Sequence, residues 1–331
     1  MKAKFTILST FHSCGVVFAV SAVLQLGVLG SSGQTNKYLF TGSETNITLN
    51  PGLYYITAYG ARGGIDAPYG GGLGAEMKGE FSFTTRTTLT LLVGGAGSTY
   101  AWAGAGGGGG GSFVVNGTTP LVVAGGGGGA GFSGSGGAGS IGTDGSGGSG
   151  GSGGPYGGAG GGGGGGFNGS GGDSGGSGGG GGGSSFIGGG GGGGGANSGG
   201  YGGGAGAGTN AGGGGGGGGY SGGGGGGEYD GRPNGGGGGG SIIDSSAMAV
   251  LAEVSGVASP DGSPNGEIII TAIPVMLSYQ VINGKLVLNW AQGTLLSAGT
   301  VNGTYTPVSG ASSPYTNSMI GAPQYFRLLV Q

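Results

Sequence analysis

The sequence has almost none of the side chains on which most enzymes and disulfide-bonded proteins depend. Its 331 residues include one cysteine, Cys14, and one histidine, His12, and only 6% of the residues are charged. Both lie in an N-terminal segment that we expect to be removed, so the mature chain would lack Ser-His-Asp triads, cysteine nucleophiles and ordinary zinc sites. We expect no catalytic residue, no metal site, no cofactor and no disulfide.

Residues 1–33 have the features of a signal peptide. Lys2 and Lys4 precede an apolar stretch from Val16 to Leu29, and small residues follow as far as Gly33. Fourteen apolar-rich residues are short for a membrane span. We therefore expect cleavage near Gly33 and export to the cell surface or beyond; an uncleaved segment that contacts the membrane is the alternative.

The chain also has few positive charges. After cleavage it would keep seven basic residues against twelve acidic ones. Such a balance, with no basic patch, predicts that nucleic acid is not a partner. An extracellular protein or a surface glycan fits the expected location better.

Glycine is what the chain has in abundance. The sequence contains 108 glycines, concentrated in a tract from Gly125 to Gly240 that holds nine large apolar side chains. Burying all nine would contribute about 20 kcal/mol, whereas ordering the tract would cost roughly 100–200 kcal/mol of conformational entropy. Side-chain burial cannot order this tract, so any order must come from hydrogen bonds between backbone segments.

Polyglycine II rods offer such an arrangement. They have three residues per turn and no internal hydrogen bonds, so their N–H and C=O groups point outward toward neighbouring rods. Unbroken runs such as Gly188–Gly195 and Gly212–Gly219 suit rods that are surrounded on all sides. Collagen is excluded by the lack of a strict G-X-Y frame, while a disordered Gly/Ser linker is the main alternative. One part of the tract predicts a polar ladder with a period of three: Ser140, Thr143, Ser146, Ser149 and Ser152.

Short β-like runs bounded by turns lie on both sides of the tract. We expect Ala75–Phe83 to pair with Thr87–Val93, Ser112–Val115 to form a hairpin with Leu121–Ala124, and Gly60–Gly74 to be a loop. The layout predicts an all-β fold in which residues 34–273 form one β-sandwich with residues 125–240 as a long insertion. The other expected strands are Tyr38–Thr41, Asn46–Leu49, Leu53–Tyr59, Ser241–Ile243, Ala247–Val254 and Glu267–Ile273.

Residues 274–331 are predicted to form a separate small β-module. Leu286, Leu288 and Trp290 alternate after a turn at Asn283-Gly284. This end resembles the small C-terminal β-modules that finish many exported bacterial proteins.

Two strand motifs carry a resemblance to a known family. The run from Leu53 to Gly64, and Ser112–Gly117 with Leu121–Ala124 leading into Gly125–Gly129, resemble the glycine-rich extracellular domain of the anaplastic lymphoma kinase and leukocyte tyrosine kinase receptors. The similarity covers Lys37–Ile273. It implies a jelly-roll-like sandwich carrying polyglycine rods, which acts as an extracellular ligand-binding or adhesive surface.

The sequence departs from those receptors in ways that limit the comparison. It has no cysteines to match the receptor disulfides, and with its only histidine at position 12 it has neither a His-Arg-Asp nor an Asp-Phe-Gly motif. The resemblance therefore does not extend to kinase chemistry, and we expect the chain not to be an enzyme.

Four tyrosines break the glycine runs where we expect turns at the ends of rods. They are the candidate ligand surface, and packing caps over the glycine lattice are the alternative: Tyr156, Tyr201, Tyr220 and Tyr229. The charged group Glu228, Asp230 and Arg232 is interpreted as a solvated turn.

These features together predict an exported, non-enzymatic cell-surface or matrix protein that adheres or binds a ligand through a polyglycine scaffold. Three alternatives stay open: a structural or ice-binding lattice, a disordered linker between two β-modules, and an exported hydrolase that uses only Asp and Glu.

Overall fold

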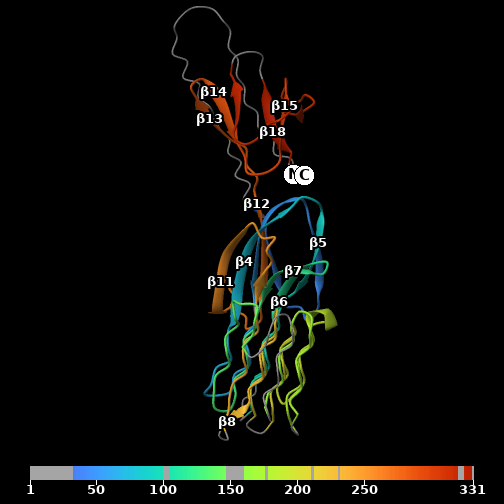
Figure 1. Cartoon of the computed structure of the whole chain (residues 1–331), viewed down its shortest axis with the longest axis vertical. Helices are drawn as coiled ribbons and strands as arrows, with labels where there is room; N and C mark the ends of the chain where they lie inside the picture. The colour runs from blue at the N-terminus through green and yellow to red at the C-terminus, as the bar shows by residue number, and fades with distance from the viewer. Residues whose placement is uncertain are drawn as a thin grey trace, which may run out of the picture. The chain divides into compact units, whose positions relative to one another are not determined.

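The structure is a computed structural model in which the chain is all-β. Over the described residues it contains strands β1 to β18 and one 3-10 turn, η1 (Phe186–Gly188), and no α-helix (Figure 1). The chain divides into a larger compact unit, Thr35–Asn50 with Tyr54–Ala272, and a smaller one that contains Ile273–Gln331. The residues described are 33–99, 104–146, 160–175, 178–209, 212–229, 232–319 and 324–329.

Two five-stranded sheets form the upper part of the larger unit. The first has the order β1 (Thr35–Leu39), β12 (Glu267–Ile273), β3 (Gly52–Tyr59), β4 (Gly74–Phe83) and β11 (Ala249–Val257). The second has the order β10 (Ile242–Ile243), β7 (Thr119–Ala124), β6 (Ser112–Asn116), β5 (Thr87–Leu92) and β2 (Thr45–Leu49).

The core lies between these sheets and draws side chains from both. Ile56, Met77 and Ile268 come from the first sheet, and Leu89 and Val114 from the second; all five are almost inaccessible to solvent. Alternate residues of a strand point to opposite faces of its sheet, so a regular strand such as β5 contributes every second residue. The predicted β-sandwich is confirmed.

One predicted strand pair is wrong. Ala75–Phe83 does not pair with Thr87–Val93, because β4 lies between β3 and β11 whereas β5 lies between β6 and β2 in the other sheet. The apolar residues of β4 and β5 pack in the same core from opposite sheets. The predicted hairpin is confirmed: β6 pairs antiparallel with β7, and Gly117 adopts φ +59° in the turn.

The glycine tract leaves the sandwich after β7 and returns to it at β10, beside the strand from which it left. Ile242 pairs with Val123, and Ile243 with Val122. Ser241 links the two ends of the tract by hydrogen bonds. Its hydroxyl accepts a hydrogen bond from the Gly125 N–H (2.9 Å) and donates one to the Ser140 carbonyl (2.5 Å). An insertion of more than 100 residues thus enters and leaves at one point of the sheet.

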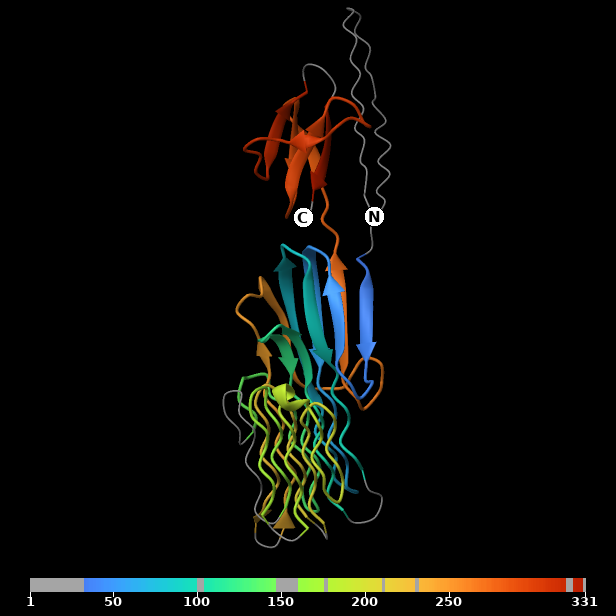
Figure 2. The same ribbon diagram turned by 90° about the vertical axis from the view of Figure 1, so that its right-hand side faces the viewer.

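Between these ends the chain forms a bundle of extended glycine segments that run side by side (Figure 2). In Gly106–Gly111 the hydrogen-bond partner repeats every third residue. Gly106 and Gly109 donate to Ala130 and Gly127, Gly107 and Gly110 to Ser98 and Gly95, and Gly108 and Gly111 to Ala205 and Gly202. One segment therefore donates to three different neighbours in rotation, the period expected of a chain with three residues per turn.

The segments approach so closely that their interior positions have no room for a side chain. A Cβ atom on Gly110 would lie 1.8 Å from the Tyr201 carbonyl oxygen, and one on Gly108 would lie 2.0 Å from the Gly216 carbonyl oxygen. Glycine is required there because neighbouring backbones occupy the space that a side chain would need.

The bundle is wider than the sequence predicts. Gly60–Gly74 is not a simple loop, since the Gly63 N–H donates to the Gly72 carbonyl and the Gly72 N–H donates to the Gly128 carbonyl. The glycine-rich stretch 94–111 also joins the bundle. The name glycine bundle is used below for the described parts of 60–74, 94–111, 125–146 and 160–240.

The smaller unit has two three-stranded sheets around its own core. Leu286, Leu288, Leu295 and Phe326 are buried in it. The Asn283-Gly284 turn has φ +49° and +69°, the positive pair that a two-residue type I′ hairpin needs. The sheet orders are β13 (Ser278–Ile282), β14 (Lys285–Asn289), β17 (Tyr315–Ser318), and β16 (Thr306–Pro307), β15 (Thr294–Ala298), β18 (Tyr325–Leu329).

Candidate interaction surface

The glycine bundle has two ends with different surroundings. The chain runs repeatedly from the sandwich to the far end and back (Figure 2). We call the turns against the sandwich proximal turns; they include Phe167, η1, Tyr201 and Tyr220. We call the turns at the opposite end distal turns; the turns 65–70 and 131–134 are described there, together with the short paired strands β8 (Glu228–Tyr229) and β9 (Arg232–Pro233).

The proximal turns are fixed to the sandwich by an aromatic cluster. Phe167 is buried and stacks on Phe186 with ring centroids 5.2 Å apart, and Phe186 packs on Phe113 of β6 at 5.0 Å. Tyr201 and Tyr220 complete the cluster. Phe113 and Val115 point outward from β6 whereas Val114 points into the sandwich core. This strand is apolar on both faces because the glycine bundle covers one of them.

The four candidate tyrosines do not form one surface. Tyr201 and Tyr220 are partly buried in the aromatic cluster, as packing residues would be. Burial raises the pKa of the Tyr201 hydroxyl, and the nearby Glu44 carboxylate raises it further. Tyr229 belongs to β8 at the distal end, and its side chain is not described. Tyr156, like Asp230, lies outside the described residues.

The distal turns are ordered by hydrogen bonds between different parts of the chain. In the first turn the Asp66 N–H donates to the Tyr69 carbonyl (3.0 Å). In the second, both the N–H and the hydroxyl of Ser133 donate to the Pro233 carbonyl of β9, each at 3.0 Å. The Gly136 N–H donates to the Gly70 carbonyl and so links the second segment to the first. Two turns and β9, which are far apart in the sequence, thus form one continuous end.

Large apolar side chains are exposed on this end. Phe132 at the tip of the second turn is 48% accessible, and Ile65 in the first is 36% accessible. Asp66 beside Ile65 is buried, and this burial raises the pKa of its carboxyl group. Neither residue is among the candidates predicted from the sequence, although both turns interrupt glycine-rich runs as the tyrosines do.

Ionisable side chains form no cluster that would hold a metal among the described residues. Asp173 accepts a hydrogen bond from the Gly182 N–H (2.7 Å), which is a structural contact within the bundle. The buried Glu267 carboxylate lies 3.2 Å from the Lys37 ammonium group. Within the part of the chain that is described, no helix is long and apolar enough to cross a membrane.

No protein-family model matches the chain, and no curated protein matches its sequence.

Proposed function

We propose that the protein is an exported, non-enzymatic cell-surface or matrix protein, and that it binds an extracellular protein or a surface glycan through the distal turns. In this proposal the glycine segments are polyglycine II rods that serve as a rigid stem. The tyrosines at the proximal turns hold the stem and do not contact the ligand.

The difference between the two ends of the glycine bundle carries the proposal. At one end, aromatic residues pack on the sandwich, so that end is occupied. At the other end, two turns that are hydrogen-bonded to each other and to β9 hold Phe132 and Ile65 at the surface. Exposed apolar residues on turns held by a rigid scaffold are typical of binding sites.

A pair of matched variants tests the proposal. The variant with Ile65→Ser and Phe132→Ser removes the exposed apolar groups of the distal turns. The control Ile187→Ser removes a 66%-accessible isoleucine from η1 at the proximal end. Binding of the secreted protein would be measured on immobilised glycans and extracellular-matrix proteins. We expect the distal variant to lose binding and the control to keep it.

Two results would contradict the proposal. One is equal binding by the distal variant and the unchanged protein. The other is failure of the unchanged protein to bind any of the immobilised glycans or matrix proteins.

A structural or ice-facing lattice is the second candidate. Thr143 and Ser146 are exposed and three residues apart, as in the predicted polar ladder, and the backbone beside them is bonded to the segment that ends at Ser241. Ser149 and Ser152 lie outside the described residues. Thermal hysteresis that disappears on Thr143→Val would support this candidate, and its absence would remove the ice-binding version.

A further inference from the structure

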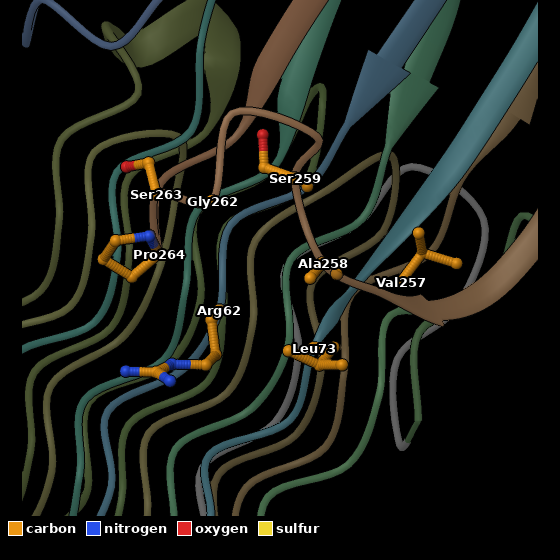
Figure 3. Close-up of a pocket in the computed structure, with 10 residues that line it drawn as sticks. Arg62, Leu73, Val257, Ala258, Ser259, Gly262, Ser263 and Pro264 are labelled. Atoms are coloured by element: carbon orange, nitrogen blue, oxygen red, sulfur yellow. The ribbon is translucent and has the colours of Figure 1, made fainter.

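A pocket of about 330 Å³ lies where the connection from β11 to β12 passes over the start of the glycine bundle (Figure 3). Gly60, Arg62 and Leu73 line it from the bundle, and Ala258, Ser259 and Pro264 line it from the connection. The pocket is separate from both the distal turns and the aromatic cluster.

Both walls of this pocket are held in place by backbone hydrogen bonds. The Arg62 N–H donates to the Pro264 carbonyl (2.9 Å), and the Arg62 carbonyl accepts from the Gly97 N–H (3.0 Å). On the connection, Asn265 Oδ1 accepts from the Ala96 N–H (2.8 Å), and the Gly262 N–H donates to the Ser259 carbonyl (3.1 Å). The pocket is thus formed before any ligand arrives, so little ordering is needed on binding.

Arg62 is the one charged residue that lines the pocket. Its Nε atom is buried and has no hydrogen-bond acceptor, and no ion pair to Arg62 is formed within the described residues. A buried donor without an acceptor is unfavourable by about 1–3 kcal/mol, and more when the group is charged. Such a group in a pocket calls for an acceptor from outside the protein.

We propose that this pocket binds the carboxylate group of a small organic acid, with Arg62 as its charged partner. A guanidinium group presents parallel N–H donors that match the two oxygens of a carboxylate. A single positive charge balances the single negative charge of that group. The remaining walls are apolar or uncharged, which favours a neutral body on the ligand.

Ser259 does not belong to the carboxylate site. Its hydroxyl is also buried without a partner, but Figure 3 shows it pointing away from the Arg62 side chain. It therefore provides a variant in the same pocket that should leave carboxylate binding unchanged.

Nuclear magnetic resonance of the secreted chain provides a direct test. The sequence has four arginines, so the Nε–H signal of Arg62 can be identified by substitution. Acetate, N-acetylglycine and glucuronate would be added at constant ionic strength, with acetamide as the uncharged counterpart. We expect a saturable shift of the Arg62 signal with at least one acid and none with acetamide. Tighter binding of N-acetylglycine would identify an amino-acid ligand, and tighter binding of glucuronate would identify a sugar-acid ligand.

Substitutions then separate the guanidinium group from its charge. With the backbone N–H signals of 62–64 and 262–264 as the readout, Arg62→Gln should weaken binding about 10–100-fold. Arg62→Lys should weaken it less, since the charge is kept. Ser259→Ala and Arg86→Lys, at an exposed arginine, should bind as the unchanged protein does.

The proposal is overturned if none of the acids gives a saturable shift, if acetamide shifts the Arg62 signal equally, or if folded Arg62→Gln binds normally. The titration of the unchanged protein decides the question even if that variant does not fold. Its result is independent of the distal turns, so it can fail while the proposed adhesive function stands.

Discussion

The sandwich and the glycine bundle are two solutions to the problem of filling a protein interior. In the sandwich, side chains such as Phe81 and Ile56 occupy the space between sheets. In the bundle, neighbouring backbones occupy it, and a Cβ on Gly60 would lie 2.0 Å from the Gly125 carbonyl oxygen. The first interior is stabilised by apolar burial and the second by hydrogen bonds between segments.

The two interiors therefore tolerate opposite kinds of substitution. A sandwich core loses stability when a side chain becomes smaller, because a cavity forms. A glycine bundle loses stability when a side chain is added, because two backbones must separate.

The largest effect is expected in the sandwich. Phe81→Ala should lower the free energy of unfolding by about 3–5 kcal/mol, because it removes one of the largest fully buried side chains. Met248→Ala is the control, since Met248 is 62% accessible. Chemical denaturation monitored by circular dichroism measures both. Equal losses in the two variants would contradict the assigned core.

Two adjacent glycines sharpen the comparison in the bundle. A Cβ on Gly193 would lie 2.1 Å from the Gly181 carbonyl oxygen, whereas a Cβ on Gly194 would meet nothing within 4 Å. We expect Gly193→Ala to destabilise by about 1–3 kcal/mol. Gly194→Ala should be neutral or stabilise by up to about 1 kcal/mol, because alanine restricts the unfolded chain. An equal fall in the denaturation midpoints of the two variants would show that the two positions do not differ in the space available for a side chain.

The aromatic cluster joins the two interiors and should show coupling between them. Phe167 and Phe186 stack at 5.2 Å with an interplanar angle of 12°. A double-mutant cycle with Phe167→Leu and Phe186→Leu should give a coupling energy of about 0.5–1.5 kcal/mol. If the effects of the two substitutions on the free energy of unfolding are strictly additive, this stacking does not stabilise the attachment of the glycine bundle to the sandwich.

The smallest effect concerns Asp66 in a distal turn. Burial raises the pKa of its carboxyl group above the ordinary value of 3.8. The folded state then holds the proton more tightly than the unfolded state, so stability falls as the pH rises through the folded-state pKa. Asp66→Asn should therefore raise the midpoint of thermal unfolding at neutral pH. This increase should disappear at about pH 3, where the carboxyl group of Asp66 is protonated in both states. The exposed Glu253→Gln is the control, and a lower midpoint for Asp66→Asn at neutral pH would refute the assignment.

Local patterns in the sequence predict much of the fold. Runs of β-branched and apolar residues bounded by turns locate strands such as Glu267–Ile273 in β12, and the Asn-Gly dipeptide locates the hairpin at Asn283. Strands on both sides of the tract predict one β-sandwich with the tract as an insertion, and the structure adds that β10 pairs with β7. The strands and the hairpin depend on residues close together in the chain.

Features that depend on contacts between residues far apart in the sequence could not be predicted from such local patterns. Apolar alternation shows that Ala75–Phe83 and Thr87–Val93 each bury one face, but it does not show whether they lie in one sheet or in two. Likewise Tyr201, Tyr220 and Phe132 all interrupt glycine-rich runs, and only the direction of each segment decides which turn lies against the sandwich. Glycine itself carries no side-chain pattern from which a neighbouring segment could be predicted.

Amide hydrogen exchange in the glycine bundle tests the backbone-held interior most directly. The N–H groups of Gly106 to Gly111 all donate to carbonyl oxygens of neighbouring segments. They should exchange as slowly as those of the central sandwich strands β6 and β7. Exchange at the rate of an unstructured peptide, while β6 and β7 stay protected, would contradict an interior built from backbone hydrogen bonds.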